Sequence, residues 1–260
     1  MTFLHRFARV LLNLLTNNPF ILSVQQLPYF YENELRKDKA HFTLSEPTSK
    51  HCVQVLRMKE GEQLQITDGN GLLATATLTL AHKKHSQVNI GEITTQDPAE
   101  GKVSIAIAPT KNMNRTEWAL EKLTEIGISE ILLMRTQRTE RMIIKEDRLR
   151  QILISAMLQS RQVFLPQLSG LLKFRAVIAR SNEYTHKWIA HCRDEGPKKL
   201  IGKAGPGESH LILIGPEGDF TPEEIQGALA PENQFEPVTL GNTRLRTETA
   251  ALVAGVLLKI

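Results

Sequence analysis

The sequence contains little cysteine and no long hydrophobic run. Its two cysteines, Cys52 and Cys192, stand far apart and outside any C-x-x-C pattern, which argues against both a disulfide framework and a zinc site. No stretch approaches the ~18 apolar residues of a membrane-spanning helix. With 41% hydrophobic and 23% charged residues, the composition is typical of a globular protein. We therefore expect a cytoplasmic protein with no metal site and no membrane span.

Two nucleotide-binding signatures are also absent. Neither G-x-G-x-x-G nor G-x-x-x-x-G-K-[ST] occurs, so the glycines of this chain form neither a dinucleotide fingerprint nor a phosphate loop. The formal charge is only +4 over 260 residues, which permits a nucleic-acid partner without requiring one. That length allows one large domain or two ordinary ones.

The most informative stretch lies near the C-terminus, where a strand, a turn and a helix start follow one another twice. Residues 211–214 (LILI) predict a short buried strand, and the glycine-containing segment after it cannot continue that strand. Thr221 is a good N-cap, Pro222 suits the first helical position, and Glu224 completes a capping box. The sequence therefore predicts a strand, a loop and a helix in that order.

The second copy consists of a predicted strand at 237–240, a loop at 241–246 and a helix at 247–258. Loops that follow parallel strands place backbone N–H groups at the carboxyl edge of a sheet, where open α/β folds bind ligands. A single glycine loop is more often a simple turn, but two loops together favour a small-molecule site. Arg244 and Arg246 oppose the dipole of the helix that follows, so we expect them to face an anion.

These motifs resemble the RsmE family, bacterial methyltransferases that modify N3 of a uridine in 16S ribosomal RNA. The resemblance covers residues 27–260 and rests on LIGPEG at 213–218, Leu240-Gly241, and LRTETA at 245–250. It implies a C-terminal SPOUT α/β domain with a trefoil knot, spanning residues 98–260, after an N-terminal PUA-like β-barrel domain at 27–97. It also implies a homodimer that acts on the small ribosomal subunit and uses S-adenosylmethionine, with no metal.

The same resemblance implies roles for individual residues. Arg246 would stabilise the negative charge that develops on uracil as N3 loses its proton. Glu248 would orient Arg246 or accept that proton, although a glutamate in a first helical turn is equally explained by the helix dipole. The residues implied in cofactor binding are Ile214, Gly215, Pro216, Glu217, Gly218, Leu240, Gly241 and Leu245.

The N-terminal part, from Leu27, reads as strands with one short helix. Ser45 caps a predicted helix through Leu56, with Val53 and Leu56 on its inner face. A hairpin is predicted over residues 63–80, with its turn at Asp68-Gly69-Asn70-Gly71. Eight Lys and Arg stand against nine Asp and Glu in residues 27–97, so any RNA contact there needs a local basic patch.

Candidate RNA contacts occur in both halves. For the candidates in the N-terminal half, an ordinary role as solvated surface side chains is an equally good explanation. The loop at 109–115 should lie at a carboxyl edge, and residues 135–150 carry six basic residues, the densest positive segment of the chain. The candidates are Arg57, Lys59, Lys111, Arg115 and Arg138.

The remaining pattern alternates strands and helices, as in a parallel sheet. A helix is predicted at 116–126, with Trp118 among its apolar positions and Gly127 at its C-terminal end. His191 ends a predicted strand without any nucleophile motif, so we interpret it as structural. Arg161 stands where many relatives in the family have a glycine, which weakens the case for a role of Arg161 in substrate binding.

Two further expectations concern the start of the chain and the function. Residues 1–26 contain no acidic residue and an interrupted apolar patch, and we interpret them as a dispensable leader rather than a signal peptide. The alternative function is a non-catalytic ribosome-assembly factor that keeps the fold and the RNA contacts. A small-molecule enzyme that uses the same glycine loops is a third hypothesis, and it predicts no salt-dependent RNA affinity.

Overall fold

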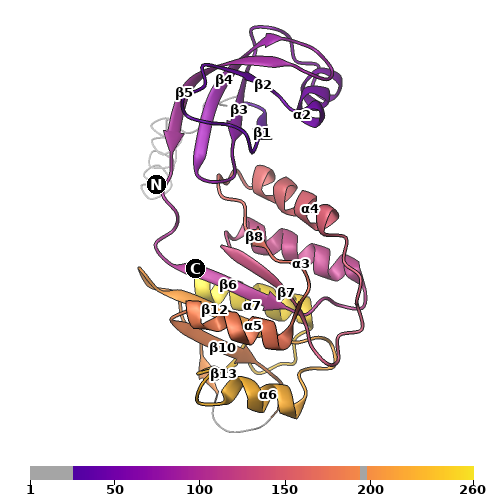
Figure 1. The fold of residues 1–260 in the computed structure, drawn as a ribbon, viewed down its shortest axis with the longest axis vertical. Helices are drawn as coiled ribbons and strands as arrows, with labels where there is room; N and C mark the ends of the chain where they lie inside the picture. The colour runs from indigo at the N-terminus through magenta and orange to yellow at the C-terminus, as the bar shows by residue number, and fades with distance from the viewer. Residues whose placement is uncertain (1–25, 194–197) are drawn as a thin grey trace, which may run out of the picture.

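The computed structural model describes residues 26–193 and 198–260, so the predicted leader lies almost entirely outside the described residues. Within these ranges the chain forms an N-terminal β-rich unit above a larger α/β unit (Figure 1). None of the helices in these ranges is long and apolar enough to cross a membrane.

The N-terminal unit is a five-stranded sheet around its own apolar core. The strand order is β1-β3-β4-β5-β2, with β1 parallel to β3 and the other neighbours antiparallel. Leu64, Ile66 and Val88 are fully buried in this core. The strands are β1 (Tyr29–Tyr31), β2 (His41–Thr43), β3 (Gln63–Thr67), β4 (Leu72–Leu80) and β5 (Gln87–Thr95).

This sheet differs from the predicted barrel in one respect. No pairing between β1 and β2 occurs within the described residues, so the two remain the edges of the sheet. Both strands have only three residues, and each uses them to pair with one neighbour, β1 with β3 and β2 with β5. Register shifts between β4 and β5 at Ala74/Ala76 and Leu78/Leu80 add curvature without closure.

The predicted helix after Ser45 divides into α2 (Glu46–Lys50) and a π-helix, η2 (His51–Val55). Ser45 caps it as expected, because its side chain accepts a hydrogen bond from the Thr48 N–H. The prediction that Leu56 faces inward is wrong, since Leu56 is 45% exposed and Cys52 is fully buried. A π-helix closes i→i+5 hydrogen bonds, here from Leu56 N to His51 O, so a 3.6-residue period misplaces its inner face.

The larger unit is built on an eight-stranded sheet in which every recorded pairing is parallel. Its order is β11-β13-β10-β12-β6-β7-β8, with β9 also paired to β7. The strands are β6 (Lys102–Ile107), β7 (Glu130–Arg135), β8 (Gln167–Leu168), β9 (Leu172–Lys173), β10 (His186–Ala190), β11 (Lys199–Leu200), β12 (Ser209–Ile214) and β13 (Glu236–Thr239).

Helices cover both faces of this sheet, because apolar side chains alternate along its central strands. In β12, Ile212 and Ile214 join the core under α3, α4 and α7, whereas Leu211 and Leu213 join the core under α5 and α6. The helices are α3 (Met113–Glu125), α4 (Glu146–Gln159), α5 (Phe174–Arg180) with the short η3 (Ser181–Glu183), α6 (Pro222–Leu229) and α7 (Thr247–Lys259).

Several predicted helix ends are confirmed. Thr221 and Glu224 form the capping box of α6, and Gly127, at φ +78°, ends α3. However, α3 begins at Met113, three residues before the predicted start, because Asn112 serves as its N-cap. Trp118 is 41% exposed and is therefore not a core residue of that helix.

The turn between β3 and β4 connects the two units. Gly71 N donates to Val163 O at 3.0 Å, and Leu165 N donates to Gly69 O at 2.9 Å. Both glycines have positive φ, and a Cβ on Gly71 would lie 2.6 Å from Gln96 O. Glycine is needed here for conformation and for close packing. The predicted hairpin turn is thus also the interface with the α/β unit.

Arg161 strengthens this interface. It follows α4 in the left-handed conformation, at φ 58°. Its guanidinium donates to Gln65 Oε1 at 3.1 Å and to Leu27 O at 3.0 Å, and it lies over the Tyr29 ring. These contacts assign Arg161 to holding the two units together.

Candidate functional site

Three strand-end loops lie side by side at the carboxyl edge of the parallel sheet. They follow β10, β12 and β13, which are neighbours in the order β13-β10-β12. Because parallel strands all end at the same edge, residues 191–193, 215–221 and 240–246 meet there, as expected for a ligand site in an open α/β sheet.

The loop after β12 is held in one conformation by its own side chains. Gly215 packs against Phe220, and a Cβ on this glycine would lie 3.1 Å from the aromatic ring. Asp219, at φ 62°, accepts from Phe220 N at 2.8 Å through Oδ1 and from Cys192 N at 3.0 Å through Oδ2. The Asp219 carboxylate therefore ties the β12 loop to the β10 loop.

A buried hydrogen bond ties the same loop to helix α7. The hydroxyl of Thr247, the first residue of α7, donates to Gly215 O at 3.0 Å. Thr247 is only 5% exposed. The β12 loop is therefore fixed on one side through Asp219 and on the other through Thr247.

Two adjoining cavities open between these loops, with volumes of about 300 and 450 Å³. Both are lined by Ala190, Cys192, Arg244, Leu245 and Ala250. The smaller cavity adds Ile214, Gly215, Pro216, Glu217, Asp219, Arg246 and Thr247, and the larger adds His191, Lys198, Val238, Thr239, Leu240, Gly241, Asn242 and Thr243.

The structure thus brings together most of the predicted cofactor-binding residues. Ile214 to Glu217 line one cavity, Leu240 and Gly241 line the other, and Leu245 lines both. Gly218 lies outside the linings of both cavities and contacts Arg138 instead. Sequence reasoning missed Ala190, Cys192 and Thr247 as lining residues. The only signal for Ala190 and Cys192 was that residues 190–192 end a third predicted strand, whereas Thr247 lies inside the motif at 245–250.

The two predicted catalytic residues lie at the start of α7. Arg246 is its N-cap residue, exposed and lining the smaller cavity. Glu248 is only 8% exposed; its Oε1 lies 3.7 Å from Arg115 Nε, and its Oε2 is buried with no hydrogen-bond partner in the described chain. The expected contact between Glu248 and Arg246 is not among the interactions of the described residues, and Arg115 is the cation that faces Glu248.

The predicted RNA-binding residues are dispersed. Lys111 is exposed beside the β12 loop, where its Nζ lies 3.0 Å from Glu140 and its backbone N donates to Glu217. Arg138 donates to Gly218 O at 2.6 Å and so supports that loop. Arg57 and Lys59 are exposed on the N-terminal unit, after the π-helix.

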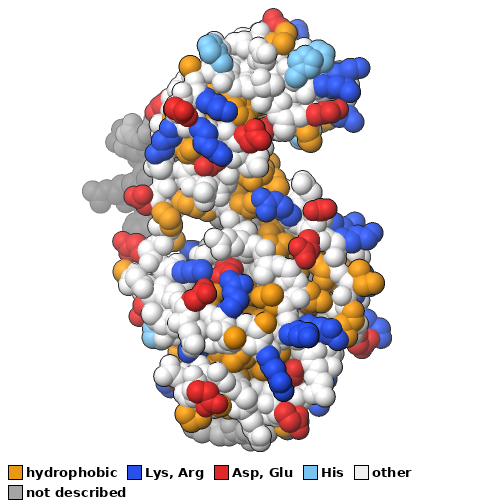
Figure 2. Space-filling view, viewed as in Figure 1, with side chains coloured by type: hydrophobic (Ala, Val, Ile, Leu, Met, Phe, Trp, Pro, Cys, Tyr) orange, Lys and Arg blue, Asp and Glu red, His pale blue; other side chains and the backbone are white. Residues whose placement is uncertain are grey.

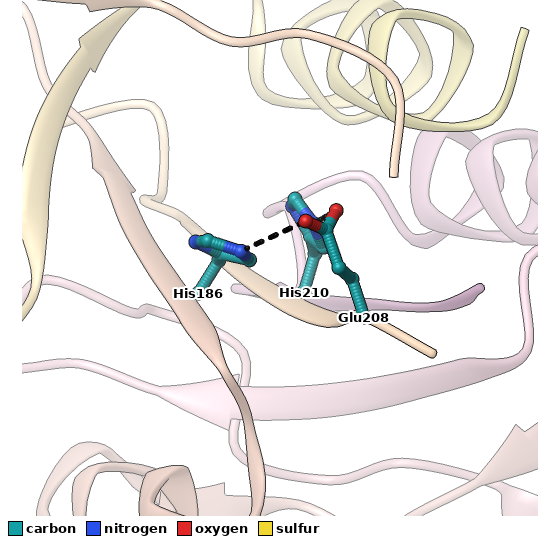
Figure 3. Close-up of side chains that lie close together, drawn as sticks. All are labelled: His186, Glu208 and His210. Carbon is teal, nitrogen blue, oxygen red and sulfur yellow. Dashed lines mark hydrogen bonds and ion pairs between the residues drawn. The ribbon is translucent and has the colours of Figure 1, made fainter. Parts of the chain in front are cut away.

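A cluster of His186, Glu208 and His210 lies at the opposite edge of the sheet, where β10 and β12 begin (Figure 3). Glu208 accepts from His210 Nε2 at 3.1 Å and lies 3.5 Å from His186 Nε2. Among the described residues these three are the one group with the spacing of metal ligands.

The hydrogen bonds of His210 oppose metal binding at Nε2. The indole N–H of Trp188, which can only donate, donates to His210 Nδ1 at 3.1 Å. The neutral ring must therefore carry its proton on Nε2, the atom that a metal would need free. A metal-bound histidine instead donates its other N–H to an acceptor. Burial lowers the pKa of His210 below its ordinary 6.5, although the bond to Glu208 opposes this shift.

Comparisons with known protein families match both units of the chain. A family model described as an RNA methyltransferase domain matches residues 97–259. A second model, described as an RNA methyltransferase PUA domain, matches residues 44–91.

Individual proteins agree with these matches. The chain is 28% identical to ribosomal RNA small subunit methyltransferase E of Mycobacterium bovis, over 86% of this chain and 88% of that protein. A probable rRNA methyltransferase from Porphyromonas gingivalis is 38% identical, with TM-score 0.77 over 88% of this chain and 96% of that one. The Neisseria gonorrhoeae ribosomal RNA small subunit methyltransferase E, solved with bound S-adenosylmethionine, is 27% identical, with TM-score 0.74 over 89% and 96% of the two chains.

Proposed function

The chain belongs to the RNA methyltransferase family, and we propose that it transfers a methyl group from S-adenosylmethionine to N3 of a uridine in 16S ribosomal RNA. One observation carries this proposal. The loops after β10, β12 and β13 surround two adjoining cavities, and the exposed Arg246 stands at their rim. The homologues named for the small ribosomal subunit support 16S RNA as the substrate.

The residues around the two cavities fit S-adenosylmethionine, which when bound supplies an electrophilic methyl group. Apolar side chains for an adenine ring come from Ile214, Leu240 and Leu245. The backbone at Gly215 and Gly241 provides hydrogen-bonding groups without bulky side chains. Arg244 and Glu217 offer charges of both signs, which suits the carboxylate and ammonium of the amino-acid part. The cavity volumes lie within the roughly 300–1,000 Å³ usual for small-molecule sites.

We assign Arg246 to the uracil base. N3 must lose its proton to become a nucleophile, and a guanidinium beside the base stabilises the negative charge that results. Arg246 is exposed at the mouth of the smaller cavity, where a base can reach it. Alignment of the uracil base with the methyl group contributes the larger share of the barrier lowering, since positioning alone can supply roughly 7–11 kcal/mol of it.

Glu248 has a supporting role in this proposal. A buried carboxylate is costly unless it is paired, and Arg115 is the cation that faces it. The second oxygen, Oε2, is buried and has no hydrogen-bond partner in the described residues, and Glu248 lines neither cavity, so a role as proton acceptor requires this side chain or its surroundings to move when the substrate binds. We propose that Glu248 holds Arg115 near the site and receives the N3 proton.

We assign RNA binding to residues 27–97 and methyl transfer to residues 98–260. The N-terminal unit presents Arg57 and Lys59 on its surface, and Lys111 and Arg115 stand beside the cofactor loops. N3 lies on the pairing edge of uracil, so the target uridine must be unpaired or flipped out of a helix before reaction. An N-terminal unit that holds the surrounding RNA helps to keep that base exposed.

The path of the C-terminal segment supports the proposed trefoil knot. After β13 the chain crosses β10 and β12, the two strands that separate β13 from β6. Helix α7 then packs against the core beside β6 and α3. Thr247 bonds the β12 loop during this crossing. A segment that returns under an earlier loop is what a knot requires.

The outer face of α7 supports the proposed homodimer. Val253, Val256 and Ile260 follow one another at helical spacing on the side away from the core, and Val256 and Ile260 are 38% and 74% exposed. A helix that is apolar on both faces is normally buried on both. A second copy of the chain packed on this face would cover it. A small-ribosomal-subunit substrate places the reaction in the cytoplasm.

The test is methyl transfer from labelled S-adenosylmethionine to small ribosomal subunits prepared from cells that lack the endogenous enzyme. We expect label in the 16S RNA with the wild-type chain and very little with Arg246→Ala. Large subunits serve as the control substrate and should remain unlabelled. Cofactor binding without transfer to any RNA would contradict the proposal and favour the non-catalytic assembly factor.

A further inference from the structure

A third cavity at this edge of the sheet is separate from the cofactor cavities. Its volume is about 770 Å³, and it lies between the end of β7, the start of α5 and helix α6. Arg135, Lys173 and Arg175 line it, with Met142 and Ile178 as apolar walls. Sequence reasoning assigned no role to Lys173 or Arg175.

The three cations stand together without recorded counter-ions. Arg135 and Lys173 are direct register partners in the parallel pair β7–β9. Like charges on neighbouring strands repel each other, so this pairing is unfavourable unless an anion lies between them. All three side chains are exposed, and in the part of the chain that the structure describes none forms an ion pair or a side-chain hydrogen bond. Figure 2 shows Lys and Arg side chains gathered beside α5 on this face.

Acidic residues on the opposite wall offset only part of the positive charge of this cluster. Glu224 is occupied, since its carboxylate accepts from Thr221 N at 3.0 Å and from Gln137 N at 2.8 Å. Glu223 lies at the rim, and hydrogen bonds from its own backbone and from Thr221 lower its pKa. Two acidic groups on the wall formed by α6 therefore face three cations on the wall formed by β7, β9 and α5.

The wall of this cavity is bonded to the cofactor loop. Thr136 and Gln137 line the cavity, and the next residue, Arg138, donates to Gly218 O at 2.6 Å. The distance from the cavity to the cofactor loop is therefore short along the surface. An RNA strand bound in this cavity would therefore adjoin the β12 loop.

We propose that the cavity binds the phosphate backbone of the RNA strand next to the target uridine. This inference rests on the proposed function and names a part of the RNA-binding surface. Arg135, Lys173 and Arg175 contact phosphates, and the apolar walls at Met142 and Ile178 receive a neighbouring ribose or base. Such an anchor beside the active site holds the strand while the target base is turned out of its stack.

The test compares Lys173→Ala, Arg175→Ala and the double variant with the wild-type chain. Binding to a 16S RNA fragment that contains the target is titrated at several salt concentrations. Each phosphate contact contributes a slope of about 0.7 in log K against log salt for a single strand. The double variant should show a slope shallower by about 1.4, with tenfold or greater loss of affinity. Its affinity for S-adenosylmethionine should stay within twofold of wild type.

The matched control is Lys203→Ala, which removes one exposed positive charge close to Leu258, near the far end of α7. It should leave affinity and salt slope unchanged, and Lys173→Arg should retain both. A wild-type slope in the double variant would overturn the inference. Weaker binding to whole subunits but not to the RNA fragment would also overturn it, because the cavity would then contact protein. The titration measures RNA binding and needs no turnover. A failure of methyl transfer would therefore count against the proposed function and not against this inference.

Discussion

Thr247 offers a direct test of how the cofactor loops are held. Its hydroxyl donates to Gly215 O at 3.0 Å in a site that is 5% exposed to solvent. Thr247→Val keeps the shape of the side chain and removes only this hydrogen bond. The remaining hydrogen bonds to the β12 loop lie further along it, at Glu217, Gly218 and Asp219, so the Gly215 end would lose its direct link to α7.

The expected size of the effect follows from burial. Removal of one partner leaves the buried Gly215 carbonyl without this donor, which typically costs about 1–3 kcal/mol. For a domain of 150–250 residues, 1 kcal/mol shifts Tm by about 2–4 °C. We therefore expect Tm to fall by roughly 2–12 °C. If about half of that free energy, about 0.5–1.5 kcal/mol, acts on the placement of Gly215 and Pro216, affinity for S-adenosylmethionine falls about two- to twelvefold, since tenfold corresponds to about 1.4 kcal/mol.

Two assays separate the outcomes. Differential scanning calorimetry measures Tm, and isothermal titration with S-adenosylmethionine measures Kd. Thr249→Val is the control, because Thr249 lies on the same helix and no side-chain hydrogen bond is recorded for it among the described residues. It should change Kd by less than twofold. A lower Tm with unchanged Kd in Thr247→Val would refute the role in cofactor binding, and no change in either would refute the whole argument.

Three further predictions follow from single contacts. Arg246→Ala should lower kcat by about 10²–10³-fold, which is the usual effect of removing one group that stabilises developing negative charge. The Kd for S-adenosylmethionine should stay within twofold of wild type. Unchanged turnover would remove Arg246 from the mechanism. Arg161→Ala should lower the free energy of unfolding by about 1–2 kcal/mol in urea titrations, because its bonds to Gln65 and Leu27 join the two units. Burial lowers the pKa of His210 in the folded chain below 6.5. As the pH falls, this histidine therefore binds its proton at a higher pH in the unfolded chain than in the folded one, which favours unfolding. The free energy of unfolding should therefore decrease between pH 7 and pH 5, and His210→Gln should show a smaller decrease; equal slopes would contradict this.

The features that the sequence predicted correctly are local ones. The capping box of α6 involves residues three apart, and Gly127 ends α3 because glycine adopts positive φ without strain. Strand β12 was predictable because its apolar run, residues 211–214, is bounded by Gly215. These signals act within one turn or one strand and do not depend on the rest of the fold.

The features that were missed depend on distant partners. Arg138 supports Gly218, 80 positions further along the chain, and Asp219 bonds Cys192, 27 positions earlier. The pairing of Arg135 with Lys173 arises from β9, a strand of two residues that carries no periodic signal. The exposure of Leu56 follows from a π-helix, whose period differs from the 3.6 residues assumed for a helix.

The most direct measurement identifies the methylated atom. Small ribosomal subunits that lack the modification are incubated with the purified chain and labelled S-adenosylmethionine, the 16S RNA is digested, and the nucleosides are analysed by mass spectrometry. The proposed function predicts that the label is recovered as 3-methyluridine. Label in any other nucleoside, or none despite demonstrated cofactor binding, would contradict it.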